Sequence, residues 1–341
     1  MITQDIIKEQ LKEINYPGMG KDIITLGIIK AIDISGTTVS VELDLRSADS
    51  NIVSEVERAV TEKLSSLDGV DSVSIKKSGE KSHATSTNMY LPEVKYKVAI
   101  ASGKGGVGKS TVSVNLAVAL AKLGLNVGLL DSDIYGPSIP LMFGIKARPE
   151  FDGKKLIPIE KYGVKLMSLG FLLTDDSPVI WRGPLVMRAL QQLMSDVEWG
   201  GIDIMLFDMP PGTGDAQLTL SQSVALDGAI IVSTPQDVAL LDAVKGVQMF
   251  QKVNVPIIGI IENMSYFICG HCQKRTDIFS SDGVRKECDR LKVDFLGEIP
   301  LDVEIRIGGD DGIPVVEKLP DNKQVKAFIE IAKRIKNNMS F

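Results

Sequence analysis

The chain has 341 residues, enough for about two domains, and its 44% hydrophobic and 24% charged residues are typical of a folded globular protein. Its formal charge of −6 at pH 7 argues against a broad nucleic-acid-binding face, which needs a basic surface. No apolar run reaches the length of a membrane span, and the first residues lack the basic-then-apolar pattern of an export signal, so we expect a cytoplasmic protein without a membrane partner.

The first 77 residues form a self-contained pattern. Helical and strand periodicities alternate within it, with a helix at residues 6–14, a strand at 38–45, a helix at 52–67 and a closing strand at 70–75. We therefore expect a small α+β domain over residues 1–77. Residues 78–94 are polar and poor in apolar side chains, which predicts a linker.

Beyond this linker the pattern changes to short apolar runs separated by helical segments. Apolar runs that alternate with helices are typical of a parallel sheet buried on both faces. We therefore expect residues 95–341 to form an α/β domain with a doubly wound, mostly parallel sheet. The runs are Lys97–Ser102, Val127–Asp131, Ile202–Asp208, Gly228–Ser233 and Ile257–Ile261.

A glycine-rich loop follows the first apolar run and leads into a helical pattern. It satisfies the P-loop motif G-x-x-x-x-G-K-S/T in the strand, loop and helix context that the motif requires. Backbone N–H groups that converge at a helix start bind phosphate, so we expect ATP here, with Lys109 at the β- and γ-phosphates and the Ser110 hydroxyl on Mg²⁺. The predicted nucleotide-binding loop is Gly103, Lys104, Gly105, Gly106, Val107, Gly108, Lys109, Ser110 and Thr111.

The second lysine of this loop, Lys104, exceeds what a phosphate cradle needs. One interpretation is that it reaches the nucleotide of a facing subunit and stabilises transition-state charge in trans, as an arginine finger does. The alternative is a solvated loop lysine.

Acidic residues end two of the apolar runs, at the sheet edge where open α/β sheets bind ligands. Asp131 could hold Mg²⁺ through a water molecule and Asp133 could orient the attacking water, or both could cap the following turn. Asp208 fits the Walker B role on Mg²⁺, and the Pro-Pro-Gly turn after it could sense a γ-phosphate or be purely structural. The predicted catalytic residues are Lys104, Lys109 and Asp133.

Two of the three cysteines, Cys269 and Cys272, form a C-x-x-C pair. Thiolates at this spacing can bind one metal centre, but Zn²⁺ or a 4Fe–4S cluster takes four ligands. We therefore expect a homodimer in which two such pairs meet on a twofold axis and hold a bridging iron–sulfur cluster, of the 4Fe–4S type. The alternatives are an intrachain zinc site that adds His271 and Cys288, a redox disulfide, and inert buried cysteines.

The run Lys104–Ser110 resembles the deviant Walker A motif of the dimeric ATPases that include the nitrogenase iron protein, the septum-site ATPases and the chromosome-partition ATPases. Those families share a nucleotide-sandwich dimer. The resemblance therefore supports the trans role of Lys104.

A more specific resemblance covers nearly all of residues 95–341. The P-loop, the Pro-Pro-Gly element, Thr234–Leu240 and the segment Asn263–Cys272 together closely resemble the Mrp/ApbC type of iron–sulfur cluster carrier ATPase. By that resemblance Asn263 contacts adenine, Cys269 and Cys272 hold a bridging cluster, apo iron–sulfur proteins receive it, and a cluster assembly scaffold is a candidate donor. The family commonly has proline after the first cysteine, where this chain has Gly270 and His271.

Residues 1–77 resemble the MIP18-type domain that often precedes such ATPases. Some members carry a cysteine in the turn after the second strand, whereas this chain reads Arg46–Asn51 there, without cysteine. Because this cysteine is missing, we do not expect the domain to handle a cluster through thiols, and we assign it a docking or regulatory role.

Two functions compete on these observations. The first is an ATP-hydrolysing carrier that transfers an iron–sulfur cluster to apoproteins. The second is a positioning or partition-type ATPase that acts on a membrane or partner surface, with structural zinc in the C-x-x-C loop. Its main support is the amphipathic tail Val325–Lys336, which could lie on anionic lipid or, as we favour, pack on the sheet as the last helix.

Overall fold

The computed structural model of the chain describes residues 4–17, 20–35, 37–43, 50–67, 70, 72–77, 90–91, 93–133, 136–172, 183–280, 282–320 and 322–339. Most of the predicted linker, residues 78–89 and 92, lies outside these ranges. The chain divides into two compact units, Met1–Thr87 and Asn88–Phe341. Each is described by itself.

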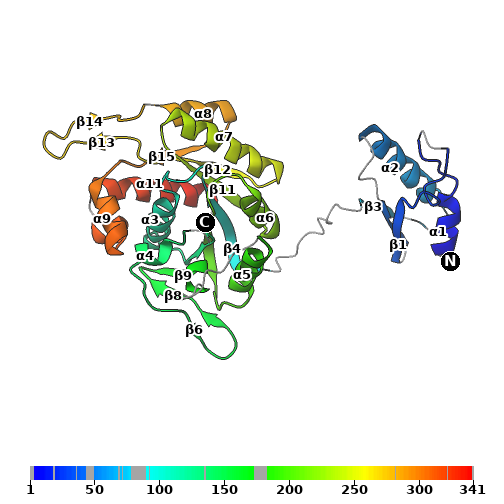
Figure 1. Cartoon of the computed structure of the whole chain (residues 1–341), viewed down its shortest axis with the longest axis horizontal. Coiled ribbons are helices and arrows are strands. Elements are labelled where there is room, and N and C mark those ends of the chain that lie inside the picture. Colours follow the sequence, from blue (N-terminus) through cyan, green and yellow to red (C-terminus); the bar gives the residue numbers. More distant parts are fainter. Residues whose placement is uncertain are drawn as a thin grey trace. The chain divides into compact units, whose positions relative to one another are not determined.

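Within its described residues, the first unit contains a three-stranded sheet and two helices (Figure 1). Its elements are α1 (Gln4–Leu11), β1 (Ile29–Ser35), β2 (Thr38–Leu43), α2 (Ser50–Ser65) and β3 (Ser72–Lys77). Strand β2 lies in the centre, antiparallel to β1 and parallel to β3. Its alternating residues Val39, Val41 and Leu43 are fully buried, because every second side chain of a strand faces the same side. The predicted α+β architecture is confirmed, and β1 is a strand that the sequence analysis did not assign.

The second unit contains an eight-stranded sheet in the order β15-β12-β11-β4-β10-β5-β9-β8. All neighbouring strands are parallel except β8 and β9. The strands are β4 (Val94–Ala101), β5 (Val127–Asp131), β8 (Ile159–Lys161), β9 (Val164–Ser168), β10 (Ile202–Asp208), β11 (Gly228–Ser233), β12 (Ile257–Glu262) and β15 (Phe295–Glu298). The predicted mostly parallel sheet is therefore confirmed, and each of the five apolar runs forms one of its strands.

Helices and short hairpins complete this unit (Figure 1). The helices are α3 (Lys109–Lys122), α4 (Ile139–Met142), the 3₁₀ turn η1 (Leu169–Leu172), α5 (Gly183–Ser195), α6 (Asp215–Ser223), α7 (Asp237–Lys252), α8 (Gly283–Leu291), α9 (Val303–Asp311), α10 (Val315–Lys318) and α11 (Lys323–Asn338). The hairpins pair β6 (Glu150–Phe151) with β7 (Leu156–Ile157), and β13 (Phe267–Ile268) with β14 (Arg275–Thr276).

Hydrophobic clusters cover both faces of the large sheet. Along β4, Val98 and Ile100 belong to the cluster that contains α3 and α11, whereas Ala99 and Ala101 belong to the cluster that contains α5, α6, α7 and α8. Successive strand residues point to opposite faces, so the two clusters lie on opposite sides of the sheet. This two-sided burial is the reason that the strands read as continuous apolar runs.

The tail helix α11 belongs to the first cluster. Its apolar side chains at helical spacing are buried against α3 and β15: Val325, Phe328, Ile331, Ala332 and Ile335. The interpretation that this helix packs on the sheet is confirmed, and its apolar face is not available to lipid. None of the helices within the described ranges combines the length and hydropathy needed to cross a bilayer.

Candidate nucleotide and cysteine sites

The glycine-rich loop lies between β4 and α3, at the carboxyl edge of the sheet. Gly106 and Gly108 have φ angles of 81° and 79°, in the left-handed region that favours glycine. A Cβ at Gly108 would also collide with the side-chain amide of Asn263. Within the described part of the chain, the backbone N–H groups of residues 105–109 donate no hydrogen bond to the protein. These free donors at the start of a helix fit a bound phosphate chain.

Asp208 brings the loop and the neighbouring strand together. It ends β10, the strand next to β4, and its side chain is fully buried. Lys109 Nζ lies 2.7 Å from Asp208 Oδ2, and the Ser110 hydroxyl donates to the same oxygen at 2.7 Å. The Ser113 hydroxyl donates to Oδ1 at 2.6 Å. One carboxylate thus holds the lysine and the first hydroxyl of the P-loop in place.

Asp131 lies beside Asp208 because β5 and β10 pair in register at these two residues. Burial, with the nearby Asp208 carboxylate as a second cause, raises the pKa of Asp131 to about 7. Its Oδ2 accepts a hydrogen bond from the Ser168 hydroxyl at 2.9 Å. Two carboxylates and the Ser110 hydroxyl form an all-oxygen donor set, which fits Mg²⁺.

The other predicted catalytic residues lie at the same edge. The Asp133 N–H donates to Asp131 Oδ1 at 3.2 Å, so the backbone of Asp133 lies beside the Asp131 carboxylate. Lys104 is partly exposed in the loop, and its carbonyl accepts a hydrogen bond from the Ser102 hydroxyl at 2.9 Å. The Pro-Pro-Gly turn also reaches the loop, since the Gly212 N–H donates to the Ser102 carbonyl at 3.0 Å.

The sequence analysis missed the serines that hold the two carboxylates. Ser113 lies one helical turn after Ser110, and this spacing was an available signal because residues three apart share a helix face. Ser168 comes from β9, far away in the sequence, and no local pattern connects it with Asp131.

Asn263 follows β12 and contacts the P-loop. Its side-chain Nδ2 donates to the Val107 carbonyl at 2.8 Å, and its backbone N–H donates to the Ser233 carbonyl at 2.8 Å. The residue is buried. The segment that leads to the cysteine pair therefore begins in contact with the P-loop.

The two cysteines lie at the tip of the β13–β14 hairpin, which extends away from the sheet (Figure 1). The Cys269 N–H donates to the Lys274 carbonyl at 3.0 Å, which closes the hairpin. Hydrogen bonds from the backbone N–H groups of Cys272 and His271 and from the Cys272 side chain hold the pKa of the Cys269 thiol below its ordinary value. Cys269 is partly exposed and Cys272 is exposed, so both thiols are open to a metal centre.

Cys288 does not join this pair. It is buried on α8, and burial raises the pKa of its thiol to about 12. Thiolate is the metal-binding form of cysteine, so Cys288 is a poor ligand. Among the residues that the structure describes, no group of three or more His, Cys, Asp or Glu side chains is placed to hold a metal ion. The geometry thus does not support the intrachain zinc site.

Glu262, which the sequence analysis also missed, is a buried carboxylate at the end of β12. It accepts hydrogen bonds from the Ser265 hydroxyl and, at 3.3 Å, from the Val284 N–H at the start of α8. Burial raises the pKa of Glu262 above its ordinary value, against the opposing effect of these bonds. Glu262 therefore connects the end of β12 with the segment that precedes the hairpin and with α8, at an electrostatic cost.

That cost predicts a pH dependence of stability. A raised folded-state pKa means that the folded protein binds the proton more tightly, so stability falls as pH rises from the unfolded value through the folded one. We expect Glu262→Gln, which can still accept from Val284 and donate to the Ser265 oxygen, to have a higher free energy of unfolding than the wild type near pH 8. Near pH 4 we expect the two proteins to be equal, as measured by chemical denaturation.

Glu287→Gln serves as the control with the opposite sign. A hydrogen bond from Arg290 lowers the pKa of Glu287, so this variant should lose stability near pH 8 and approach the wild type in acid. A Glu262→Gln effect that is the same at both pH values would contradict the assigned origin.

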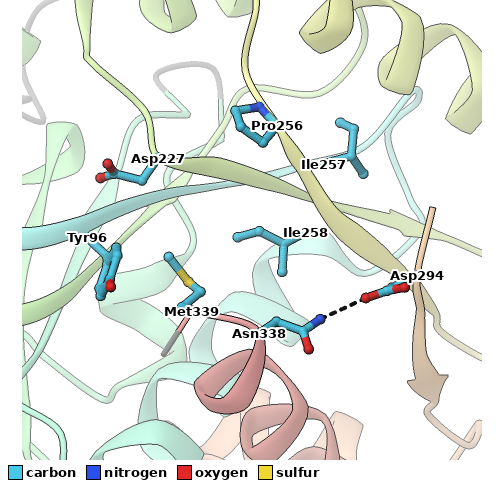
Figure 2. A pocket seen from close by; sticks show the side chains of 8 residues that line it. All are labelled: Tyr96, Asp227, Pro256, Ile257, Ile258, Asp294, Asn338 and Met339. Atoms are coloured by element: carbon cyan, nitrogen blue, oxygen red, sulfur yellow. Dashed lines mark hydrogen bonds between the residues drawn. The ribbon is translucent and has the colours of Figure 1, made fainter. Parts of the chain in front are cut away.

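A cavity of about 630 Å³ lies at the end of the sheet where the parallel strands begin, opposite to the carboxyl ends that carry the P-loop (Figure 2). Its lining includes residues near the starts of β4, β11, β12 and β15, together with the end of α11, where Asn338 donates to Asp294 at 2.9 Å. The full lining is Tyr96, Asp227, Pro256, Ile257, Ile258, Asp294, Asn338 and Met339. Because the P-loop follows the carboxyl end of β4, this cavity is separate from the nucleotide site.

Comparisons with known proteins agree with this geometry. Residues 93–336 match a family model described as NUBPL iron-transfer P-loop NTPase, and residues 4–76 match one described as iron-sulfur cluster assembly protein. The chain is 44% identical over 352 residues to the iron-sulfur cluster carrier protein of Synechocystis. This match covers 100% of this chain and 99% of the relative. It is 52% identical over 251 residues to an Arabidopsis thaliana iron-sulfur protein required for NADH dehydrogenase. This match covers 73% of this chain and 80% of the relative.

A solved structure shows the same fold with nucleotide. The nucleotide-binding protein of Archaeoglobus fulgidus in complex with ADP superposes with a TM-score of 0.62 at 37% sequence identity, and the match covers 70% of this chain and 94% of that chain.

Proposed function

The chain belongs to the family of iron-transfer P-loop NTPases of the NUBPL type, and from this premise we propose that it is an ATP-hydrolysing carrier that transfers an iron–sulfur cluster to apoproteins. The resemblance to cluster carriers with a MIP18-like first domain is thereby confirmed. We retain 1–77, 78–94 and 95–341 as the proposed boundaries, with docking or regulation as the role of the first domain.

One observation carries the proposal. The cysteine pair lies on a hairpin whose first strand, β13, begins at Phe267, shortly after β12 ends at Glu262. Asn263, the residue that follows β12, contacts the P-loop. A site for a thiolate-bound cargo is thus joined to a site for nucleotide by a short segment. A cluster held by two thiolates per chain, at an exposed hairpin tip, is accessible to an acceptor protein.

In the proposed carrier, two copies meet so that both cysteine pairs face one axis. Four thiolates from Cys269 and Cys272 of the two chains then hold one 4Fe–4S cluster as cargo. Cys269 suits this role because its pKa is lowered by neighbouring N–H groups, which favours the thiolate. The donor of the cluster would be an assembly scaffold.

At the nucleotide site, residues 103–111 bind the phosphates and Asn263 contacts adenine. Ser110, Asp208 and Asp131 would hold Mg²⁺, which neutralises phosphate charge. Lys109 stabilises the charge of the β- and γ-phosphates, Asp133 orients the attacking water, and Lys104 reaches the nucleotide of the facing copy.

Cluster transfer tests the function directly. Anaerobic reconstitution of the wild type with iron and sulfide should yield a chromophore, and this protein should activate an apoenzyme that needs a 4Fe–4S cluster faster than the same amounts of free iron and sulfide do. The rate with ATP should differ from the rate without it. Activation no faster than with free ions, or zinc rather than iron bound to anaerobically purified protein, would contradict the proposal.

A further inference from the structure

The segment between the P-loop and the cysteines is short and fixed at both ends. Only residues 264–268 separate Asn263, whose side chain holds the Val107 carbonyl at 2.8 Å, from Cys269. There is no free space between Asn263 and the loop, because a Cβ at Gly108 would collide with the Asn263 amide. A change in the loop backbone at Val107 or Gly108 must therefore displace Asn263.

The residues after Asn263 are bound to the loop that follows β15. The Ser265 N–H donates to the Ile299 carbonyl at 2.9 Å, and the Leu301 N–H donates to the Tyr266 carbonyl at 2.7 Å. These bonds restrain the two residues that directly precede the hairpin, which begins at Phe267. Because Met264 and Ser265 alone separate Asn263 from Tyr266, we expect a displacement of Asn263 to strain these two hydrogen bonds and so to reach Tyr266.

Arg275 connects Tyr266 with the hairpin. It lies on β14 opposite Ile268, the residue before Cys269. Its guanidinium stacks on the Tyr266 ring at 4.0 Å, and its Nη1 donates to Glu298 Oε2 at 3.0 Å. Its Nε donates to Oδ1 of Asp277, the residue that follows β14, at 2.9 Å. One side chain thereby joins the cysteine hairpin to Tyr266 and to the end of β15.

These contacts suit a positioning role better than a role in fold stability. About half of the Arg275 side chain is exposed, and exposed ion pairs contribute little to folding. A planar guanidinium that stacks on a ring while donating hydrogen bonds in its plane does, however, fix a direction that a point charge does not.

We propose that Arg275 is a positioning residue for the two thiols, through which occupation of the P-loop by nucleotide changes the reactivity of Cys269 and Cys272. This inference rests on the proposed function, because it assigns to the cargo site a means of responding to the nucleotide site. It concerns the apoprotein as well as the loaded carrier, since every contact in the path belongs to this chain.

Thiol alkylation of the cluster-free full chain tests the inference. Iodoacetamide modification of Cys269 and Cys272 is followed by mass spectrometry at one fixed pH, with and without saturating Mg-ADP. We expect the two rates in the wild type to differ at least about fivefold, the low end of coupling between two sites. Arg275→Met keeps an unbranched side chain but loses the charge and the in-plane donors. In this variant we expect the alkylation rates with and without Mg-ADP to have a ratio of one, at unchanged ADP affinity.

Two further variants separate positioning from general loosening of the hairpin. Arg275→Lys keeps the charge over Tyr266 and should restore part of the ratio. Arg290→Met, on the exposed surface of α8, should keep the wild-type ratio. If Arg275 merely stabilised the hairpin, Arg275→Met would raise both rates and leave their ratio unchanged, which would overturn the inference.

A wild-type ratio smaller than about fivefold would overturn the inference as well, because a smaller change falls below the usual range of site-to-site coupling. Its failure is distinguishable from failure of the proposed function. A chain whose thiols ignore Mg-ADP can still bind and transfer a cluster, and a chain whose thiols respond to Mg-ADP can still fail to bind iron.

Discussion

Replacing either Cys269 or Cys272 with serine is expected to remove the iron–sulfur cluster. If two copies supply four thiolates, each single substitution removes two ligands per dimer, and a hydroxyl does not replace a thiolate on iron. Iron and sulfide bound after anaerobic reconstitution should therefore fall at least about tenfold, together with the thiolate-to-iron absorbance. ADP binding should stay at the wild-type level, because neither cysteine lies in the P-loop.

Cys288→Ala is the matched control. This thiol is buried on α8 and its pKa is raised to about 12, so we expect the variant to keep its full iron content. Iron loss in Cys288→Ala comparable to that in Cys269→Ser would contradict the assignment of the cluster to the hairpin. So would wild-type iron content in Cys269→Ser.

Replacing Lys109 with methionine is expected to remove ATPase activity and to destabilise the fold at once. Lys109 is 6% exposed and pairs at 2.7 Å with Asp208, which is fully buried. Without the lysine, nucleotide binding should weaken about 100-fold, since one charged hydrogen bond contributes roughly 3 kcal/mol. Leaving the Asp208 carboxylate without its cation should cost about 3 kcal/mol of folding free energy, the low end for broken buried pairs because Ser110 and Ser113 still donate to it.

Lys104→Met provides the contrast within the same loop. Lys104 is partly exposed and has no buried carboxylate partner among the described residues, so this variant should keep the wild-type stability and most of its ADP affinity. It should lose turnover if the lysine acts on the facing copy. Isothermal calorimetry, denaturation and phosphate release separate the three effects. Equal stability of Lys109→Met and Lys104→Met would contradict the role of the Lys109–Asp208 pair.

The central strands could be predicted from the sequence because they are buried on both faces, as the alternating partners along β4 show. Strands β8, β9 and β15 were not predicted. They lie at or near the two edges of the sheet, and β8 and β15 are only three and four residues long. A short strand with one neighbour carries a weak apolar pattern, so its existence depends on the sheet that it joins.

The chemistry of both sites was determined by the sequence itself. The glycine-rich loop with Lys109 and Ser110 is one continuous stretch, and so is the pair Cys269 and Cys272, so the spacing of the reactive groups is set by the local backbone. The tertiary structure decided which distant residues complete the sites. It brought Asp208 to Ser110 and Asn263 to Val107, and it left Cys288 buried away from the other cysteines. The physical reason is that these contacts follow from the order and register of parallel strands, which depend on the packing of the whole sheet and not on any local pattern.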